Sequence, residues 1–300
     1  MTLEQIRIFL CVAELCHVTR AAERLNLTQS AVSAAIRALE RHYDVQLFDR
    51  IGRGIALTEA GHLFTAQAQR LMREAESTRA LLGNLAREPG GSLRIWASQT
   101  IANYWLAPRL IALHQRWPGI TVTLHPGNTH EVAQAVMEGH ADIGLIEGDL
   151  PPSDLLARNV GHDELVLVLP RRHPLARKPR LDAGDYRAMD WLMREPGSGT
   201  RAVAEHHLRD MGLAPSDLRI VLDLPTNEAI LGAIRSGRFA ALLSWRAIRP
   251  GEGRVFALRR IQWSPRPIRA FSALTDPRRF RTRAMTAFLD ILDTRRSPRP

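Results

Sequence analysis

The sequence has few cysteines, a single lysine and no long apolar run. Cys11 and Cys16 lie on one expected helix, where their side chains point about 140° apart, so a disulfide between them is disfavoured. We expect both to be small, buried or half-buried residues; a redox sensor is the less favoured alternative, because the C-terminal two thirds contain no cysteine. No stretch approaches the roughly 20 apolar residues that span a bilayer, which argues against a membrane partner.

The N-terminus, MTLEQIRIFLCVAEL, has none of the basic character of a signal peptide. Glu4 and Glu14 lie where a secretory signal would carry positive charge and an uncharged apolar core. We therefore expect folded structure from the first residues and a cytoplasmic protein. At 300 residues, the chain is long enough for a small domain followed by a larger one.

The net charge of +10 is concentrated at one end of the chain. Residues 1–91 carry 11 arginines against 10 acidic residues, whereas residues 249–300 carry 13 arginines against four acidic residues. Nucleic-acid affinity in the N-terminal region would therefore depend on the placement of individual arginines rather than on bulk attraction. We interpret the basic C-terminal region as a solvated surface, with DNA contact as the alternative.

Residues 19–40, TRAAERLNLTQSAVSAAIRALE, predict two short helices joined by a tight turn. We expect Thr19 to cap the first helix, Asn26 and Leu27 to form the turn, and Thr28 to cap the second. Apolar residues at helical spacing are expected to face inward: Ala31, Val32, Ala35, Ile36 and Leu39. The second helix turns small or hydrogen-bonding residues outward, where they can contact DNA in the major groove: Gln29, Ser30, Ser33 and Arg37. A helical hairpin inside a core is the alternative.

The motifs AAERLNLTQSAVSAAIRALE, QLFDR and LTEAG lie in one ungapped segment, residues 3–61. This segment resembles the N-terminal domain of LysR-type transcriptional regulators. The resemblance implies a winged helix-turn-helix over residues 1–57 that binds a double-stranded DNA operator, with Thr28 joining the four outward residues at the DNA. It also implies a homodimer or homotetramer, with RNA polymerase as a further candidate partner. The chain departs from the common pattern at Ala34, often arginine in the family, and at residues 54–56, where relatives carry more basic residues.

After the second helix, Val45–Arg50 and Ile55–Leu57 are expected to pair as a short hairpin, the wing. Glycines at the intervening turn supply conformations that other residues resist. Arg50 and Arg53 flank that turn and are expected to reach phosphate or the minor groove.

A long helix is expected over residues 58–87, with Thr58 as its cap. Apolar residues recur along it at alternating steps of four and three, the heptad spacing of helices that pack along one another. We predict a dimerisation helix with Phe64, Leu71 and Leu82 in the interface, in preference to packing on its own small domain.

Residues 88–92, EPGGS, predict a hinge, and the pattern then changes to strands alternating with helices. This rhythm predicts an α/β domain over residues 93–300 with largely parallel sheets. The family resemblance implies two lobes like those of periplasmic binding proteins. Lobe I would comprise about 93–162 and 270–300, and lobe II about 163–269.

Two segments are expected at the carboxyl ends of strands, where ligands bind in open α/β sheets. Ser98, Gln99 and Thr100 would lie in lobe I, and Ser198, Gly199 and Thr200 in lobe II, each at a helix N-terminus that favours anions. The paired segments predict a cleft that closes on a small anionic metabolite; plain helix capping is the alternative. Further residues are expected to face the cleft: Asn128, Thr129, Glu147 and Asn227.

Glu147 would repel an anionic ligand beside it, so it is expected either to pair with an arginine or to bind a ligand hydroxyl or amine. The segments SQTI, GNTHEV, LIEGD and DELVLVLP most resemble the family branch with sulfur-metabolism and carbon-fixation regulators. The sequence does not specify which small molecule is the effector, and no cofactor is expected.

Other functional classes find little support in the sequence. Ser198 lacks the spacing of a nucleophile elbow, and neither a P-loop nor a dinucleotide fingerprint is present. His206 and His207 face different sides of a helix, which makes them a poor metal pair, so we expect no metal site and no enzyme. A solute-binding protein for transport would explain the two lobes but not residues 1–87.

Overall fold

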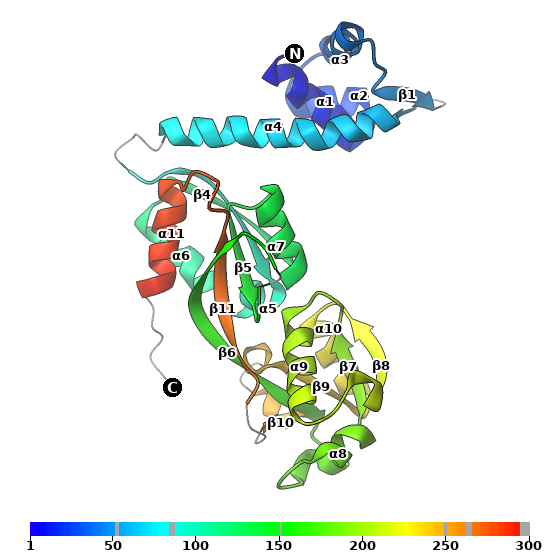
Figure 1. Ribbon diagram of the computed structural model, residues 1–300, viewed down its shortest axis with the longest axis vertical. Helices are drawn as coiled ribbons and strands as arrows, with labels where there is room; N and C mark the ends of the chain where they lie inside the picture. The colour runs from blue at the N-terminus through cyan, green and yellow to red at the C-terminus, as the bar shows by residue number, and fades with distance from the viewer. Residues whose placement is uncertain (52–53, 84–87, 151, 249–250, 262–265, 295–300) are drawn as a thin grey trace. The chain divides into compact units, whose positions relative to one another are not determined.

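A computed structural model describes the chain except for residues 52–53, 84–87, 151, 249–250, 262–265 and 295–300. The chain divides into two compact units, Met1–Leu82 and Gly83–Pro300, shown in Figure 1. Within the described part of the chain, no helix is both long and apolar enough to cross a membrane.

The first unit is three helices, a two-stranded wing and a long helix. Its elements are α1 (Leu3–Leu15), α2 (Val18–Leu25), α3 (Gln29–Tyr43), β1 (Phe48–Ile51), β2 (Gly54–Leu57) and α4 (Glu59–Gly83). The core centres on the fully buried Phe9, whose ring lies 5.4 Å from that of Phe48 and 4.7 Å from that of Phe64. These contacts join α1, the wing and α4 in one small domain.

The helix boundaries follow from capping groups. The Thr28 side chain accepts a hydrogen bond from the backbone N–H of Ala31 at 3.2 Å, so the predicted cap of α3 is confirmed. The predicted cap at Thr19 is wrong, because α2 begins earlier and the His17 side chain accepts from the N–H of Arg20. Asn26 ends α2 with φ of 54°, a left-handed conformation that asparagine tolerates in turns.

The wing is held against α3 by hydrogen bonds to Glu40. Glu40 Oε1 on α3 accepts hydrogen bonds from the backbone N–H groups of Leu47, at 2.9 Å, and Phe48, at 3.3 Å. Gly61 lies so close to the Leu47 carbonyl that a Cβ there would overlap it. The predicted hairpin is therefore present, with its first strand beginning at Phe48 instead of Val45.

The long helix α4 begins as predicted, since the Thr58 hydroxyl accepts from the N–H of Gly61 at 2.9 Å. Phe64, predicted to face a partner helix, instead packs on Phe9 inside its own domain. Leu71 is 43% exposed and Leu63 is 69% exposed, so a row of apolar surface remains on this helix. The Leu82 side chain and residues 84–87 of the predicted helix lie outside the described residues.

The second unit is one continuous sheet, in strand order β4-β3-β5-β11-β6-β9-β7-β8, with β10 beside β6. We call the part around β3, β4, β5 and β11 lobe I, and the part around β7, β8, β9 and β10 lobe II. The strands are β3 (Gly91–Ser98), β4 (Ile120–Gly127), β5 (Ile143–Glu147), β6 (Leu156–Pro170), β7 (Asp190–Arg194), β8 (Arg219–Leu224), β9 (Phe239–Ser244), β10 (Phe256–Arg260) and β11 (Ile268–Thr275).

Helices cover the sheet of each lobe. Lobe I has α5 (Gln99–Tyr104), α6 (Ala107–Arg116), α7 (Thr129–Glu138) and α11 (Arg283–Thr294). Lobe II has α8 (Ala183–Ala188), α9 (Gly199–Asp210) and α10 (Asn227–Ser236). Each lobe has its own buried core, with Phe271 and Phe288 central in lobe I and Trp191 in lobe II.

The strand β6 runs from lobe I into lobe II (Figure 1). It pairs with β11 up to Glu164 and with β9 from Leu165 onward. The expectation of largely parallel sheets is only half right. In both lobes the central strands are parallel, but β6 and β11 pair antiparallel with all their neighbours because they carry the chain between lobes. The predicted hinge is also too long, since β3 already begins at Gly91.

Candidate functional site

The first candidate site is the outward face of α3. Val32, Ile36 and Leu39 are buried, which leaves Gln29, Ser30 and Arg37 exposed and Ser33 half-buried. Gln29, Ser33 and Arg37 follow one another at four-residue steps, so they form one line along the helix. Ala31, predicted to face inward, is exposed, because it lies in the first turn beyond the edge of the core.

The wing supplies a second part of this surface. Arg50 is exposed on β1 and pairs in register with Ile55 on β2, next to the turn. Arg53, the other predicted wing residue, lies outside the described residues. The two sets, the α3 line and the wing arginine, are polar groups on a small, well-packed domain.

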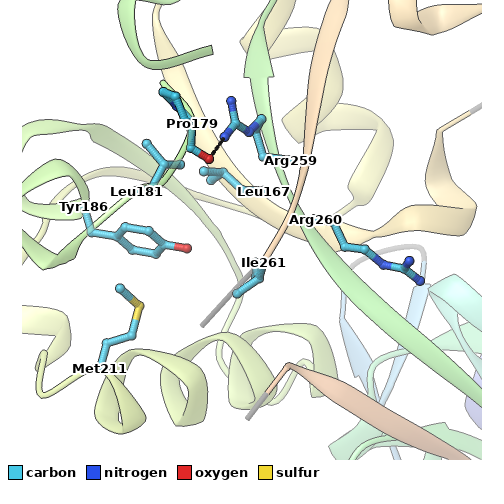
Figure 2. A pocket seen from close by; sticks show the side chains of 8 residues that line it. All are labelled: Leu167, Pro179, Leu181, Tyr186, Met211, Arg259, Arg260 and Ile261. Atoms are coloured by element: carbon cyan, nitrogen blue, oxygen red, sulfur yellow. Dashed lines mark hydrogen bonds between the residues drawn. The ribbon is translucent and has the colours of Figure 1, made fainter. Parts of the chain in front are cut away.

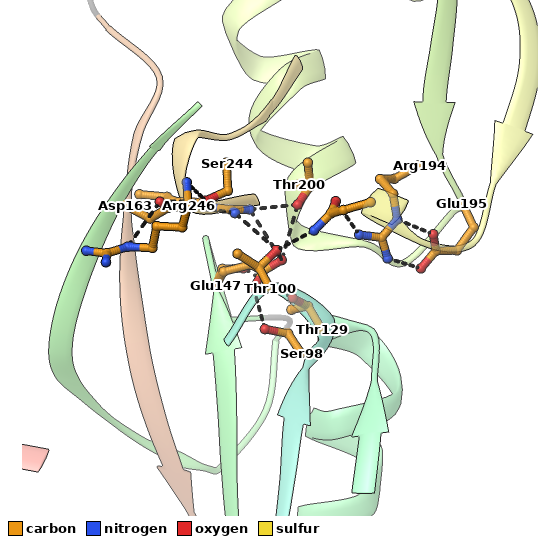
Figure 3. A network of polar contacts seen from close by, with 12 residues as sticks. Ser98, Thr100, Thr129, Glu147, Asp163, Arg194, Glu195, Thr200, Ser244 and Arg246 are labelled. Carbon is orange, nitrogen blue, oxygen red and sulfur yellow. Dashed lines mark hydrogen bonds and ion pairs between the residues drawn. The ribbon is translucent and has the colours of Figure 1, made fainter. Parts of the chain in front are cut away.

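The second candidate site lies between lobes I and II, where helices begin after strands. Ser98 ends β3, Thr100 lies in the first turn of α5, and Glu147 ends β5. The Thr100 hydroxyl donates to Glu147 Oε1 at 3.0 Å, and the Ser98 hydroxyl donates to Oε2. From lobe II, the Thr200 hydroxyl donates to Glu147 Oε1 at 3.2 Å. Figure 3 shows these side chains converging on one carboxylate.

An arginine that the sequence reading missed completes this cluster. Arg269 on β11 is 3% exposed and donates to Asp163 Oδ2 at 2.7 Å and to the Thr200 hydroxyl at 2.9 Å. Its Nη1 lies 3.4 Å from Glu147 Oε1. Of the two expectations for Glu147, the structure therefore shows pairing with an arginine.

Asparagine and serine side chains extend the network into lobe II. Asn227, at the start of α10, donates to the Thr100 hydroxyl at 3.2 Å and accepts from Arg194 at 3.1 Å. Ser244, at the end of β9, donates to Asp163 at 2.8 Å. Arg194, Ser244 and Asp163 were also missed by the sequence reading. They lie inside or at the ends of apolar strands, where a single polar residue gives no periodic signal.

The predicted anion between Thr100 and Thr200 needs correction. Both hydroxyls donate to the chain's own Glu147, and both residues are at most 1% exposed, so an external ligand does not share these donors in this conformation. The predicted residues do meet from opposite lobes, but around an internal carboxylate.

An open cleft of about 530 Å³ lies beside this cluster. Its wall in lobe I includes Thr129 and His130 at the start of α7, and its wall in lobe II includes Ser198, Gly199 and Arg201 at the start of α9. Asn128 is the capping residue of α7 and accepts from the N–H of Glu131 at 3.0 Å. Two acidic side chains, Asp149 and Glu205, also line the cleft.

The lobes contact each other through residues that line the cleft. The N–H of His130 in lobe I donates to the carbonyl of Gly197 in lobe II at 3.2 Å. Within lobe I, the Thr129 hydroxyl donates to the Glu147 carbonyl at 3.2 Å. Gly199 packs on that same carbonyl, so that a Cβ would overlap it. Gln99, another predicted residue, keeps its Oε1 buried with no hydrogen-bond partner among the described residues.

A second cavity, in lobe II, is too small for a metabolite. Figure 2 shows it between Leu167, Leu181, Tyr186, Met211 and the strand of Arg259. Its volume of about 30 Å³ is far below the 530 Å³ of the open cleft. The described residues also contain no group of three or more His, Cys, Asp or Glu side chains placed to hold a metal ion.

Known proteins match the chain along nearly all of its length. Residues 3–62 match the family model for the bacterial regulatory helix-turn-helix protein, lysR family, and residues 86–297 match the LysR substrate binding domain. A probable RuBisCO transcriptional regulator of Cyanophora paradoxa is 34% identical over 295 residues, which is 96% of this chain and 90% of that protein. The uncharacterized HTH-type transcriptional regulator YeiE of Escherichia coli K12 is 37% identical, covering 83% of this chain and 82% of its own.

Solved structures agree with this assignment. Full-length CbnR, solved in complex with its target DNA, has a TM-score of 0.74 at 23% identity and covers 98% of this chain and 99% of its own. The regulatory domain of CcmR from Synechocystis PCC6803, in complex with 2-PG, has a TM-score of 0.61 at 26% identity and covers 68% of this chain and 96% of its own. The predicted fold, a helix-turn-helix domain with a two-lobed α/β domain, is therefore confirmed. The chain belongs to the LysR family of DNA-binding transcriptional regulators, which are not enzymes.

Proposed function

We propose that this regulator senses a small anionic metabolite in the open cleft between lobes I and II. The observation that carries the proposal is the cleft itself, about 530 Å³ and lined from both lobes. That volume is within the range of small-molecule sites. The helices α7 and α9 begin in its wall, and first-turn N–H groups of a helix favour a negative charge. Thr129, Ser198 and Gly199 are the predicted residues that line it directly.

The other charged side chains that line the cleft narrow the class of ligand. Asp149 and Glu205 are hydrogen-bond acceptors, while Arg201 is already paired with Glu205 at 2.8 Å and with Asp223 at 2.9 Å. A ligand with an anionic group and one or more hydroxyls would satisfy both walls better than a bare inorganic anion. The regulatory domain of CcmR binds 2-PG, a small anionic metabolite, which supports the anionic group in this proposal, and the RuBisCO regulators among the relatives favour a ligand connected with carbon fixation.

We further propose that the chain binds its operator as a homodimer or homotetramer. Thr28, Gln29, Ser30, Ser33 and Arg37 would face the major groove, with Arg50 and Arg53 at phosphate or the minor groove. The exposed Leu71 on α4, and Leu82 farther along, would pair two chains, so that two recognition helices read two half-sites. Because a transcriptional regulator acts on DNA, we also propose a cytoplasmic location. Contact with RNA polymerase at the promoter is a further part of the proposal.

We also propose that three segments of the chain have different functions. Residues 1–57 would bind DNA, residues 58–87 would dimerise, and residues 93–300 would sense the effector. A solute-binding protein for transport is disfavoured, because residues 3–62 match a DNA-binding family model.

A thermal-shift screen of the full chain tests the effector. The panel would hold two- and three-carbon phosphorylated acids, hydroxy acids and inorganic phosphate, because binding stabilises by RT ln(1 + [L]/Kd). We expect a hydroxylated or phosphorylated acid to raise Tm more than inorganic phosphate does. Ser198→Ala should weaken the response about 10-fold or more, whereas Ser236→Ala, on the exposed surface of α10, should not change it. Equal responses of both variants would place the ligand elsewhere.

A further inference from the structure

The Glu147 carboxylate has the full set of partners that a bound anion would have. It accepts from the hydroxyls of Ser98, Thr100 and Thr200 and pairs with Arg269. A carboxylate offers about four acceptor positions. The three hydroxyls donate to it, and the Arg269 guanidinium, 3.4 Å away, balances its charge. Glu147 itself is 2% exposed.

The partners of Glu147 come from both lobes. Ser98 and Thr100 belong to lobe I, and Thr200 belongs to the first turn of α9 in lobe II. Its backbone carbonyl also packs against Gly199 of lobe II. The same residue therefore bridges the lobes through both its side chain and its main chain.

The charges around Glu147 are balanced without an outside ion. Arg269 pairs with Glu147 and, at 2.7 Å, with Asp163, while Arg246 lies 3.5 Å from Asp163. Two carboxylates thus face two guanidinium groups. A second anion at the same donors would be a like charge within about 4–6 Å of Glu147, which disfavours its binding.

We infer that Glu147 acts as an intramolecular ligand: its carboxylate fills the deep anion position, holds lobe II on lobe I, and confines an anionic effector to the outer cleft. The last clause rests on the proposed function; the first two do not. Glu147 is a positioning residue in this account. Closure of the lobes then does not require effector, and the effector changes the outer contacts between α7 and α9.

Removing the carboxylate should leave a hole that a free carboxylate can fill. In Glu147→Ala, the three hydroxyls and Arg269 would remain around the space of one small anion. Breaking a buried ion pair by deleting one partner is strongly destabilising, so we expect Tm of the full chain to fall by about 5–15 °C. Formate or acetate, compared with chloride at constant ionic strength, should restore part of that loss with a saturable dose dependence.

The matched control is Glu228→Ala. Glu228 also joins the lobes, since it accepts from Asn103 at 3.1 Å, but it lies at the exposed rim. We expect this variant to change Tm by no more than about 2 °C, because exposed polar pairs contribute little, and to gain nothing specific from formate. A formate response of equal size in wild type, Glu228→Ala and Glu147→Ala would overturn the inference, as would an unchanged Tm in Glu147→Ala.

If Glu147→Ala does not yield folded protein, Glu147→Gln tests the same point. It keeps the side chain's volume but removes the charge that pairs with Arg269. We expect faster hydrogen exchange at residues 128–130 and 197–202, on the two sides of the lobe contact, and no rescue by formate, because the space stays filled. Wild-type exchange in both segments would overturn the inference. A failed metabolite screen would overturn only the proposed effector site, since these measurements use no effector.

Discussion

His207 on α9 is a buried polar residue outside both candidate sites. It is 1% exposed, and neither ring nitrogen has a hydrogen-bond partner among the described residues. Burial lowers the pKa of His207, an effect that Asp210 opposes and His206 reinforces. The neutral ring is therefore the form that the folded protein accommodates next to Tyr186.

This lowered pKa predicts a loss of stability in mild acid. Above the ordinary histidine pKa of about 6.5, the ring is neutral in both folded and unfolded chains. Below it, the unfolded chain takes up the proton first. The free energy of unfolding therefore decreases as the pH is lowered, until the pH reaches the pKa of His207 in the folded protein. We expect urea unfolding of the α/β unit to show a weaker pH dependence between 7 and 5 in His207→Leu than in wild type. His114→Ala, exposed on α6, is the control and should keep the wild-type pH dependence; an identical pH dependence of His207→Leu and wild type would contradict the prediction.

Some residues of the site between the lobes can be predicted from the sequence, and others cannot. Ser98, Thr100, Glu147 and Thr200 could be predicted because each lies at or just after the carboxyl end of an apolar strand. Arg269 could not, because its role depends on β11 returning beside β6, a pairing between residues more than a hundred positions apart. Composition and periodicity predict local structure. The ion pair between Arg269 and Asp163 instead depends on which strands lie side by side in the folded sheet.

Among the elements, α4 has exposed apolar side chains that could pack against a second chain. Leu63 and Leu71 lie two helical turns apart and are 69% and 43% exposed. Apolar side chains in a row on a helix are typical of a surface that packs on another helix. Ala68, from the same heptad pattern, is 1% exposed and belongs to the domain's own core, so the pattern combines two kinds of contact.

We predict that Leu71→Asp converts the oligomer to monomer. A carboxylate in an apolar interface loses its hydration without gaining a partner, a cost of several kcal/mol. Light scattering should show the monomer mass, and operator affinity should fall in parallel. Gln69→Asp, which adds the same charge at another exposed position of α4, should keep the oligomer. An unchanged mass for Leu71→Asp would mean that the chains associate through another surface.

It is easier to predict from the sequence that a segment forms a strand than to predict which strands it pairs with. The apolar runs of β5, β7 and β9 are nearly fully buried and were readable from the sequence. β10 and β11 are harder to predict from the sequence, because Arg259, Arg260 and Arg269 interrupt their apolar patterns. These arginines are stabilised by distant partners; Arg259, for example, donates to the carbonyl of Ala176 at 2.9 Å.

The wing is a second element expected at the DNA. Its Arg50 should contribute to the affinity for DNA more than to the choice of sequence. Arg50→Ala removes one positive charge from the exposed end of β1. If Arg50 contacts phosphate, affinity should fall about equally for operator and unrelated duplex, and the slope of log K against log salt should decrease by about one. Fluorescence anisotropy titrations at several salt concentrations would measure both. A change in base preference with an unaltered salt slope would show that Arg50 reads bases instead.

At the scale of the whole molecule, DNA binding and effector sensing use separate parts of the chain. The N-terminal unit presents a polar line on α3, and the C-terminal unit holds a cleft between two lobes. Coupling between them is a difference in free energy between at least two states, and it must act equally in both directions on binding. An effector that alters operator affinity must therefore bind with altered affinity when operator is present.

The central claim, that α3 reads DNA sequence in a regulator with two recognition helices, is tested most directly by selection from a random duplex library. The full chain should enrich a motif with two symmetric half-sites about one helical turn apart, or a multiple of that spacing. Ser33→Glu should abolish this enrichment while leaving Tm unchanged, since Ser33 is only half-buried and lies between Gln29 and Arg37 on the outward line. Enrichment of the same motif by Ser33→Glu, or no motif with the wild-type chain, would contradict the account.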